Sequence, residues 1–131
     1  MKNTIFKLLG YSYYFSLLIL FVLYLFPGSL IGYLLYGNLG QQPDLISNPI
    51  GTSINHLIFF FYLTTLGLIV RLKYQNFLNS FTFLFSLSIL LELAQWSIPN
   101  RAFEYYDLFG NNIGVMTAYL VINIFLKLKI K

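Results

Sequence analysis

The chain contains no cysteine, and histidine occurs only once, as His56. The lack of cysteine excludes a disulfide framework, a thiolate nucleophile and a cysteine-based metal site. A protein zinc site needs three or four ligands, and beside a single histidine only carboxylates remain to supply them. We therefore predict no metal.

Charge is also scarce. Only 9% of the residues are charged, whereas about 25% are charged in a typical soluble domain. Hydrophobic residues make up 58% of the chain, and the mean hydropathy is +0.73. This composition predicts an all-α, polytopic membrane protein. Four helices of about 20 residues would use most of the chain, so we expect a single transmembrane domain over residues 1–131.

Four apolar segments are separated by polar or turn-forming residues, and each predicts a helix that spans the membrane. They cover residues 11–36, 56–70, 77–98 and 108–126. Pro27 and Gly28 should end or kink the first helix, with residues 29–36 continuing as a shorter piece at the membrane surface. Residues 37–54 predict an irregular loop that either folds back over the helix ends or contacts a partner. The expected architecture is an antiparallel bundle of four helices.

The positions of lysine and arginine predict the orientation, because positive residues beside short loops stay on the cytoplasmic side. Every positive residue except Arg101 lies before the first segment, between the second and third, or after the fourth. Both termini are therefore expected in the cytoplasm, with the protein in a bacterial inner membrane. The positive charge should favour anionic lipid head groups and does not imply a nucleic-acid partner. The acidic residues then lie at or near the outer side: Asp44, Glu92, Glu104 and Asp107.

Polar residues concentrate in residues 91–114, where the chain is otherwise apolar. A carboxylate such as Glu92 costs about 2.5 kcal/mol or more at the centre of a bilayer, so it needs a partner or a site. Glu92 and Gln95 share one face of a helix, as do Asp107 and Asn111. The short connection between the third and fourth segments should bring these pairs together near the outer surface. Three further residues complete the predicted polar site: His56, Arg101 and Gly114.

Structural roles compete with functional ones at each of these positions. Glu92 can form an ion pair with Arg101 that only locks the helix hairpin. Asp107 can be a plain N-cap of the fourth helix, and Asn111 and Gly114 can serve helix packing. The many aromatic residues are more simply lipid-facing packing and an interfacial belt, although a pigment against these faces stays open.

The order Glu92-x-x-Gln95, Pro99-x-Arg101, Asp107-x-x-x-Asn111-x-x-Gly114 resembles the C-terminal signature of VanZ-like membrane proteins. Members of that family also tend to carry Asp-Lys-x-x-His-Phe at the start of the second span. Here only His56 matches that motif, because Thr52 and Ser53 stand in place of the acidic and basic residues. The founding family member is linked to low-level resistance to teicoplanin. The resemblance therefore implies an outer-facing polar site and a cell-envelope role, without naming a reaction.

Three functions could use such a site. In the first, Arg101 grips a phosphate or carboxylate of a membrane amphiphile while His56, Gln95 and Asn111 orient it. In the second, Glu92 or Asp107 is a general acid or base in an intramembrane enzyme, although the sequence contains no nucleophile motif. In the third, the chain is an accessory subunit of a larger membrane complex. We favour the first, with a bound lipid and no other cofactor expected, and keep the accessory subunit as the alternative.

Overall fold

The structure is a computed structural model that describes residues 2–43 and 51–129. The described residues form helices and no strand, which confirms the all-helical prediction. In chain order the helices and 3-10 turns are α1 (Lys2–Leu25), α2 (Leu30–Tyr36), α3 (Gly51–Arg71), η1 (Phe77–Asn79), α4 (Phe81–Ala94), η2 (Gln95–Ser97) and α5 (Tyr105–Lys129).

The first apolar segment forms two helices where the sequence predicts one interrupted span. Helix α1 begins at Lys2, before the predicted start at residue 11, and ends at Leu25, directly before Phe26 and Pro27. Proline has no backbone N–H to continue the helix, and Gly28 takes a positive φ of 90° that turns the chain. The predicted break at this proline and glycine is confirmed, and α1 extends to the N-terminal side of the predicted apolar segment.

Helix α2 is a short piece fixed at both ends. Ser29 caps its start by accepting a hydrogen bond from the backbone N–H of Gly32, and Gly37 ends it in the left-handed conformation. The chain then turns back, and the carbonyl of Leu39 accepts from the backbone N–H of Ser29 at 2.7 Å. The described start of the irregular loop therefore folds over α2. Asp44 lies outside the described residues.

The remaining segments differ from their predicted bounds mainly at the ends. The segment predicted at residues 56–70 is longer, because α3 begins at Gly51. The segment predicted at residues 77–98 is a shorter α-helix, since Ser80 caps α4 and single 3-10 turns lie on either side. The segment predicted at residues 108–126 extends at both ends to Tyr105 and Lys129.

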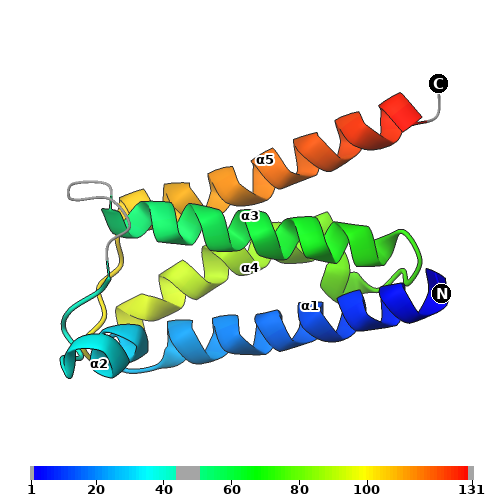
Figure 1. The fold of residues 1–131 in the computed structure, drawn as a ribbon. Coiled ribbons are helices and arrows are strands. Elements are labelled where there is room, and N and C mark those ends of the chain that lie inside the picture. The colour runs from blue at the N-terminus through cyan, green and yellow to red at the C-terminus, as the bar shows by residue number, and fades with distance from the viewer. Residues whose placement is uncertain (1, 44–50, 130–131) are drawn as a thin grey trace.

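The four long helices alternate in direction along the chain. Figure 1 shows α1 and α4 running one way and α3 and α5 the other, with the start of α1 and the end of α5 at the same end of the molecule. Helices α3 and α5 pack very closely: a Cβ added at Gly110 or Gly114 would lie 2.5 Å from the carbonyl oxygen of Ser53 or Leu57, respectively. The two glycines therefore permit this close approach of α5 to the backbone of α3.

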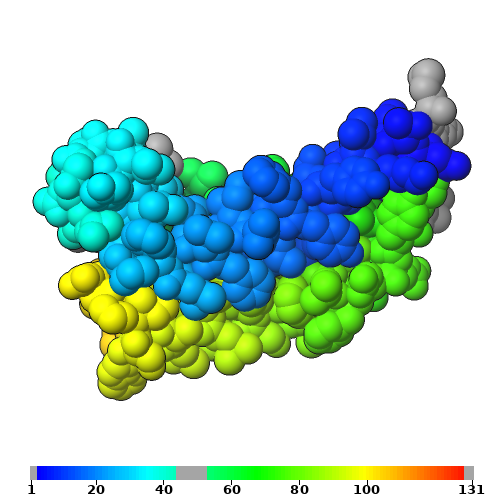
Figure 2. Space-filling model, turned by 90° about the horizontal axis from the view of Figure 1, so that it is seen from below, coloured from blue at the N-terminus to red at the C-terminus, as the bar shows by residue number. Residues whose placement is uncertain are grey.

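The core between the helices is apolar and aromatic. Tyr13 and Leu20 of α1, Phe60 and Leu63 of α3 and Leu84 of α4 are almost completely buried. Figure 2 views the molecule from the side of α1. It shows α2 as a lobe at one end of α1, with the chain near residue 100, in yellow, against that same end.

By length and composition, three of the described helices are apolar enough to cross a membrane. They cover Asn3–Leu25, Ser53–Arg71 and Tyr105–Leu128, while Phe81–Ser97 is apolar but shorter. Large hydrophobic side chains are exposed along all of these helices, including Phe15, Leu90 and Phe125. Such a surface suits lipid rather than water.

Candidate ligand-binding site

A cluster of polar side chains is buried at the end of the bundle where α2 lies. Four helices contribute to it: Tyr24 comes from α1, His56 from α3, Glu92 from α4, and Asp107 and Asn111 from α5. Glu92 and Asn111 are completely buried, and Asp107 is 3% exposed. We call these five residues the polar cluster. The predicted meeting of the third and fourth segments with His56 is thus present.

Asn111 is the centre of the polar cluster. Its Oδ1 accepts a hydrogen bond from the Tyr24 hydroxyl at 2.8 Å, and its Nδ2 donates to Glu92 Oε2 and to the carbonyl of Ser88, each at 3.3 Å. The Tyr24 oxygen also lies 2.6 Å from His56 Nδ1. His56 Nδ1 also lies 3.2 Å from Asn111 Oδ1. One amide therefore joins all four long helices.

Asp107 holds the other side of the histidine ring. His56 Nε2 lies 3.5 Å from Asp107 Oδ2, and the Ser53 hydroxyl donates to Asp107 Oδ1 at 2.7 Å. Helix α5 begins at Tyr105, so Asp107 lies within its first turn. The interpretation of Asp107 as a plain N-cap was therefore wrong: its carboxylate faces α3.

The expected ion pair between Glu92 and Arg101 does not form among the described contacts. Glu92 instead accepts hydrogen bonds from Asn111 and from the backbone N–H of Glu104, at 3.3 Å to each. Its Oε2 also lies 3.9 Å from His56 Nδ1. The buried carboxylate is thus held by an amide and by the loop that follows α4.

Arg101 binds the end of α1. Its Nη2 donates to the carbonyl of Leu23, and its Nε donates to the carbonyl of Phe26 at 3.4 Å. In a continuous helix the carbonyl of Leu23 would accept from the N–H of residue 27, which is Pro27 and has none. Arg101 therefore supplies the hydrogen bond that proline removes. Burial lowers the pKa of the Arg101 guanidinium from its ordinary value, but arginine remains protonated at neutral pH.

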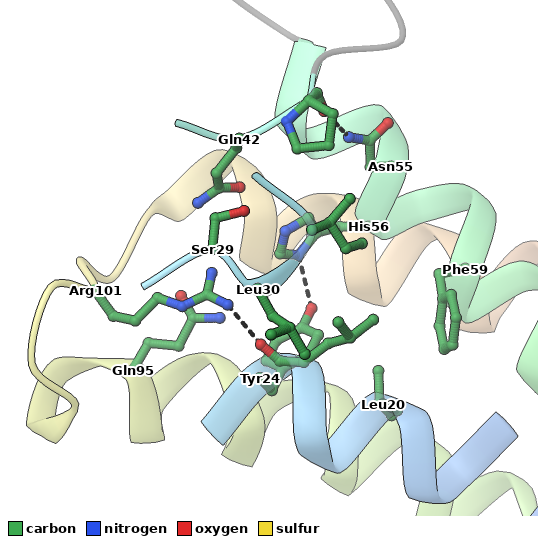
Figure 3. A pocket seen from close by; sticks show the side chains of 13 residues that line it. Leu20, Tyr24, Ser29, Leu30, Gln42, Asn55, His56, Phe59, Gln95 and Arg101 are labelled. Atoms are coloured by element: carbon green, nitrogen blue, oxygen red, sulfur yellow. Dashed lines mark hydrogen bonds between the residues drawn. The ribbon is translucent and has the colours of Figure 1, made fainter. Parts of the chain in front are cut away.

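A partly open cavity of about 130 Å³ lies beside the polar cluster. Tyr24 and His56 form part of its wall, and Arg101 and Gln95 form another part. Figure 3 shows the Arg101 and Gln95 side chains close together at one side of this cavity. The other lining residues are Leu20, Leu23, Ser29, Leu30, Ile31, Gln42, Pro43, Asn55 and Phe59.

Gln95 differs from the members of the polar cluster. Its side chain is only 3% exposed, yet its buried Nε2 has no hydrogen-bond partner among the described residues. Asn55 also leaves its Oδ1 without a partner there, while its Nδ2 donates to the carbonyl of Pro43 at 2.6 Å. A buried polar atom without a partner usually marks an unseen water, an ion or a ligand. Gln95 and Asn55 both line the cavity.

The structure separates the seven residues predicted for the polar site into three positions. Glu92, Asp107, Asn111 and His56 share the polar cluster, and His56 also reaches the cavity. Gln95 and Arg101 line the cavity without joining the cluster's hydrogen bonds. Gly114 instead permits the close contact between α5 and the backbone of α3. Among the described residues, no group of three or more His, Cys, Asp or Glu side chains has an arrangement suited to a metal ion.

Sequence reasoning missed Tyr24 and Ser53. The chain has 11 tyrosines, so one tyrosine in an apolar helix carries no special signal. The clue for Tyr24 was its place one turn before Pro27. The clues for Ser53 were its place one turn before His56 and its position within the family motif that includes His56.

A small all-helical protein with lipid-compatible helices and a buried polar cluster at one end belongs to the class of polytopic membrane proteins. The VanZ/LLP1 family matches residues 15–126, and the chain belongs to that family. The resemblance drawn from the C-terminal motifs is thereby confirmed. Comparisons with curated proteins and with solved structures give no match.

Proposed function

We propose that this VanZ-family membrane protein binds the polar head of a lipid or lipid-linked cell-envelope amphiphile in the cavity beside the polar cluster. The observation that carries the proposal is Gln95: this residue lines the cavity beside Arg101 (Figure 3), and its buried Nε2 has no hydrogen-bond partner among the described residues. A bound phosphate or carboxylate would accept hydrogen bonds from both side chains.

Arg101 can hold an anion while it caps α1. The described hydrogen bonds use Nε and Nη2, and a guanidinium has five N–H donors in all. At least one nitrogen is thus left to face the ligand. Because burial in an apolar setting strengthens charge-assisted hydrogen bonds, such a pair would be stronger here than at a water-exposed surface.

The cavity suits the head of an amphiphile rather than a whole lipid. About 130 Å³ holds several water molecules or one small polar group. Leu20, Leu30 and Phe59 give the cavity an apolar side toward α1, α2 and α3. The acyl or polyprenyl chain of the ligand would leave the cavity past these residues and lie along the outer helix surface.

The proposal includes four membrane crossings, with α4 as a short span beside three longer ones. Both termini would be cytoplasmic and the cavity would face the extracytoplasmic side of a bacterial inner membrane. Support comes from the basic residues: Arg71 ends α3 and Lys73 follows it, at the end of the bundle opposite α2 (Figure 1), and Lys127 lies near the end of α5. That distribution agrees with the tendency of positive residues to remain in the cytoplasm.

An accessory subunit of a membrane complex is the second candidate. Two observations support it. The residues of the polar cluster hydrogen-bond to one another, and Arg101 donates to the carbonyls of Leu23 and Phe26 and so stabilises the end of α1. In this alternative the polar residues only fix the helix arrangement, and the exposed apolar faces contact other subunits.

The direct test is Gln95→Leu, a replacement of similar size that removes the unpartnered donor. We would extract the wild type and the variant in mild detergent and measure co-purified lipids by mass spectrometry. The wild type should retain an amphiphile with a phosphate or carboxylate above its share of the membrane. Gln95→Leu should retain roughly ten times less of it, because a hydrogen bond to a charged group contributes about 1.5–3 kcal/mol.

Gln41→Leu is the matched control, since Gln41 is exposed on the loop after α2 and does not line the cavity. It should retain the amphiphile like the wild type. Equal retention by Gln95→Leu would contradict the proposal. If neither protein retains a lipid and a stoichiometric protein partner co-purifies instead, the accessory subunit is the better account. Arg101→Ala is a poorer test, because it also removes the cap of α1.

A further inference from the structure

A second cavity, of about 500 Å³, lies at the opposite end of the bundle between α3, α4 and α5. Figure 1 shows the last part of α5 diverging from α3 at this end. Polar residues from three elements line the cavity, among them Arg71, Ser80 and Asn123. Leu68 and Leu126 contribute apolar surface. The cavity therefore has a polar part and an apolar part side by side. We call this cavity the basic groove.

Arg71 is fixed at one side of the basic groove. Its Nη1 donates to the carbonyl of Asn76 at 2.8 Å and lies 3.5 Å from Asn79 Oδ1. Asn79 is completely buried and donates to the carbonyl of Tyr74, so the turn that positions the arginine is well ordered by hydrogen bonds. The described hydrogen bonds leave Nε and Nη2 of Arg71 for another acceptor.

This end of the molecule has positive charge and no acidic side chain to neutralise it. The acidic residues of the whole chain are Asp44, Glu92, Glu104 and Asp107. Residues 57–91 and 108–131 contain none, so the carboxylates of α4 and α5, Glu92 and Asp107, lie at the opposite ends of these helices from the groove. Lys73 turns toward α1, where it donates to Asn3. Lys127 is one helical turn beyond Asn123, on the same face of α5.

We propose that the basic groove binds the head group of an anionic phospholipid. Arg71 would hold the phosphate, with hydrogen bonds from Ser80 and Asn123 and added attraction from Lys127. The lipid tail would lie along Leu68 and Leu126. A lipid is favoured over a free phosphate because the groove combines the cation with apolar surface, and because basic cavities between membrane helices suit anionic head groups.

The test measures lipid preference. Purified protein would be exchanged into vesicles of phosphatidylcholine mixed with phosphatidylglycerol, and the lipids that remain bound after mild detergent extraction would be quantified. The wild type should be enriched in phosphatidylglycerol. Arg71→Gln should lose about tenfold of that enrichment, as expected for the loss of a charge-assisted hydrogen bond to the head group.

Lys7→Gln is the matched control. It removes one exposed positive charge from α1 at the same end of the bundle but outside the groove, and it should leave the enrichment unchanged. An equal loss in Lys7→Gln and Arg71→Gln would show general attraction to the surface and overturn the proposal.

Asn123→Phe gives a second, charge-neutral test by filling the groove from α5. It should lower phosphatidylglycerol enrichment while Arg71 is still present, and it serves if Arg71→Gln does not fold. Soluble glycerol phosphate should fail to displace the lipid from the wild type. Displacement by glycerol phosphate, or unchanged enrichment in both variants, would contradict a lipid site. None of these variants touches Gln95 or Arg101, so the result is independent of the proposed function.

Discussion

The two ends of this helical bundle differ in where their charged side chains lie. At the end with α2, carboxylates are taken into the interior and given partners: Glu92 contacts Asn111, and Asp107 contacts Ser53. At the other end, Lys7 and Lys127 are exposed, and Arg71 borders an open groove. A single short chain thus has one end where polar groups hold helices together and one end where they face the surroundings.

The difference teaches where polar residues should matter for stability. A buried carboxylate must be hydrogen-bonded, because leaving it unpaired in an apolar interior costs several kcal/mol. An exposed lysine loses little when it is replaced. We therefore expect a gradient of effects on the free energy of unfolding from the polar cluster to the basic end.

Asn111→Leu should cause the largest loss. It removes the amide that contacts Tyr24, His56 and Glu92 together. Hydrogen bonds between membrane helices contribute about 0.6 kcal/mol each on average, and the stranded carboxylate adds its own cost. We expect a loss of roughly 2–4 kcal/mol, measured by unfolding in mixed detergent micelles.

Asn112→Leu is the comparison for that change. Asn112 is the next residue of α5, is half-buried, and makes one side-chain contact to α4 through Ser88. Its replacement should cost about 0.6 kcal/mol. Equal losses of unfolding free energy for the two asparagines would mean that the polar cluster stabilises the fold no more than a single hydrogen bond between helices does.

Gly114→Ala should follow. The added Cβ would lie 2.5 Å from the carbonyl oxygen of Leu57, so α3 and α5 must move apart. Overpacking of this kind costs about 1–3 kcal/mol. Gly10→Ala is the control, because nothing lies within 4 Å of a Cβ at that position. It should keep or slightly raise stability, since alanine favours the helix; a similar loss at both glycines would contradict the close contact.

Ser53→Ala should have a smaller effect. It removes one hydroxyl donor to Asp107 and leaves the contact of Asp107 with His56 in place. We expect a loss of about 1 kcal/mol in the same unfolding measurement. A Ser53→Thr variant, which retains the hydroxyl, should keep most of the stability that alanine loses. Equal stability of the alanine and threonine variants would show that the hydrogen bond to Asp107 does not stabilise the fold.

Lys7→Gln and Lys127→Gln should change least. Both side chains are exposed at the basic end, so each replacement should stay within about 0.5 kcal/mol of the wild type. A loss from either lysine that matches Asn111→Leu would erase the contrast between the two ends.

Much of the fold could be predicted from the sequence because apolar length and turn residues are local signals. Pro27 and Gly28 predict the end of α1, and the motif around Asp107 and Asn111 predicts that both face one site. Helix starts were less accurate, as at α1, because apolar residues and single lysines are compatible with a helix that continues beyond the membrane.

The pairing of charges could not be predicted from the sequence. Opposite charge suggested that Glu92 would face Arg101, but the carbonyls at the end of α1 compete for the guanidinium because Pro27 cannot bond to Leu23. That competition depends on how α1 meets the loop after α4, which is a tertiary contact. The contacts of Tyr24 with His56 and Asn111 are also tertiary contacts, so the sequence did not predict them.

The central claim is that the cavity lined by Gln95 and Arg101 binds one kind of polar-headed amphiphile. Its most direct measurement places the photo-crosslinker p-benzoylphenylalanine at Phe59, which lines the cavity, and separately at Phe125, which is exposed on α5. After irradiation in native membranes, the account predicts a single dominant anionic adduct at position 59 and a mixture of bulk lipids at position 125. The same lipid mixture at both positions would contradict it.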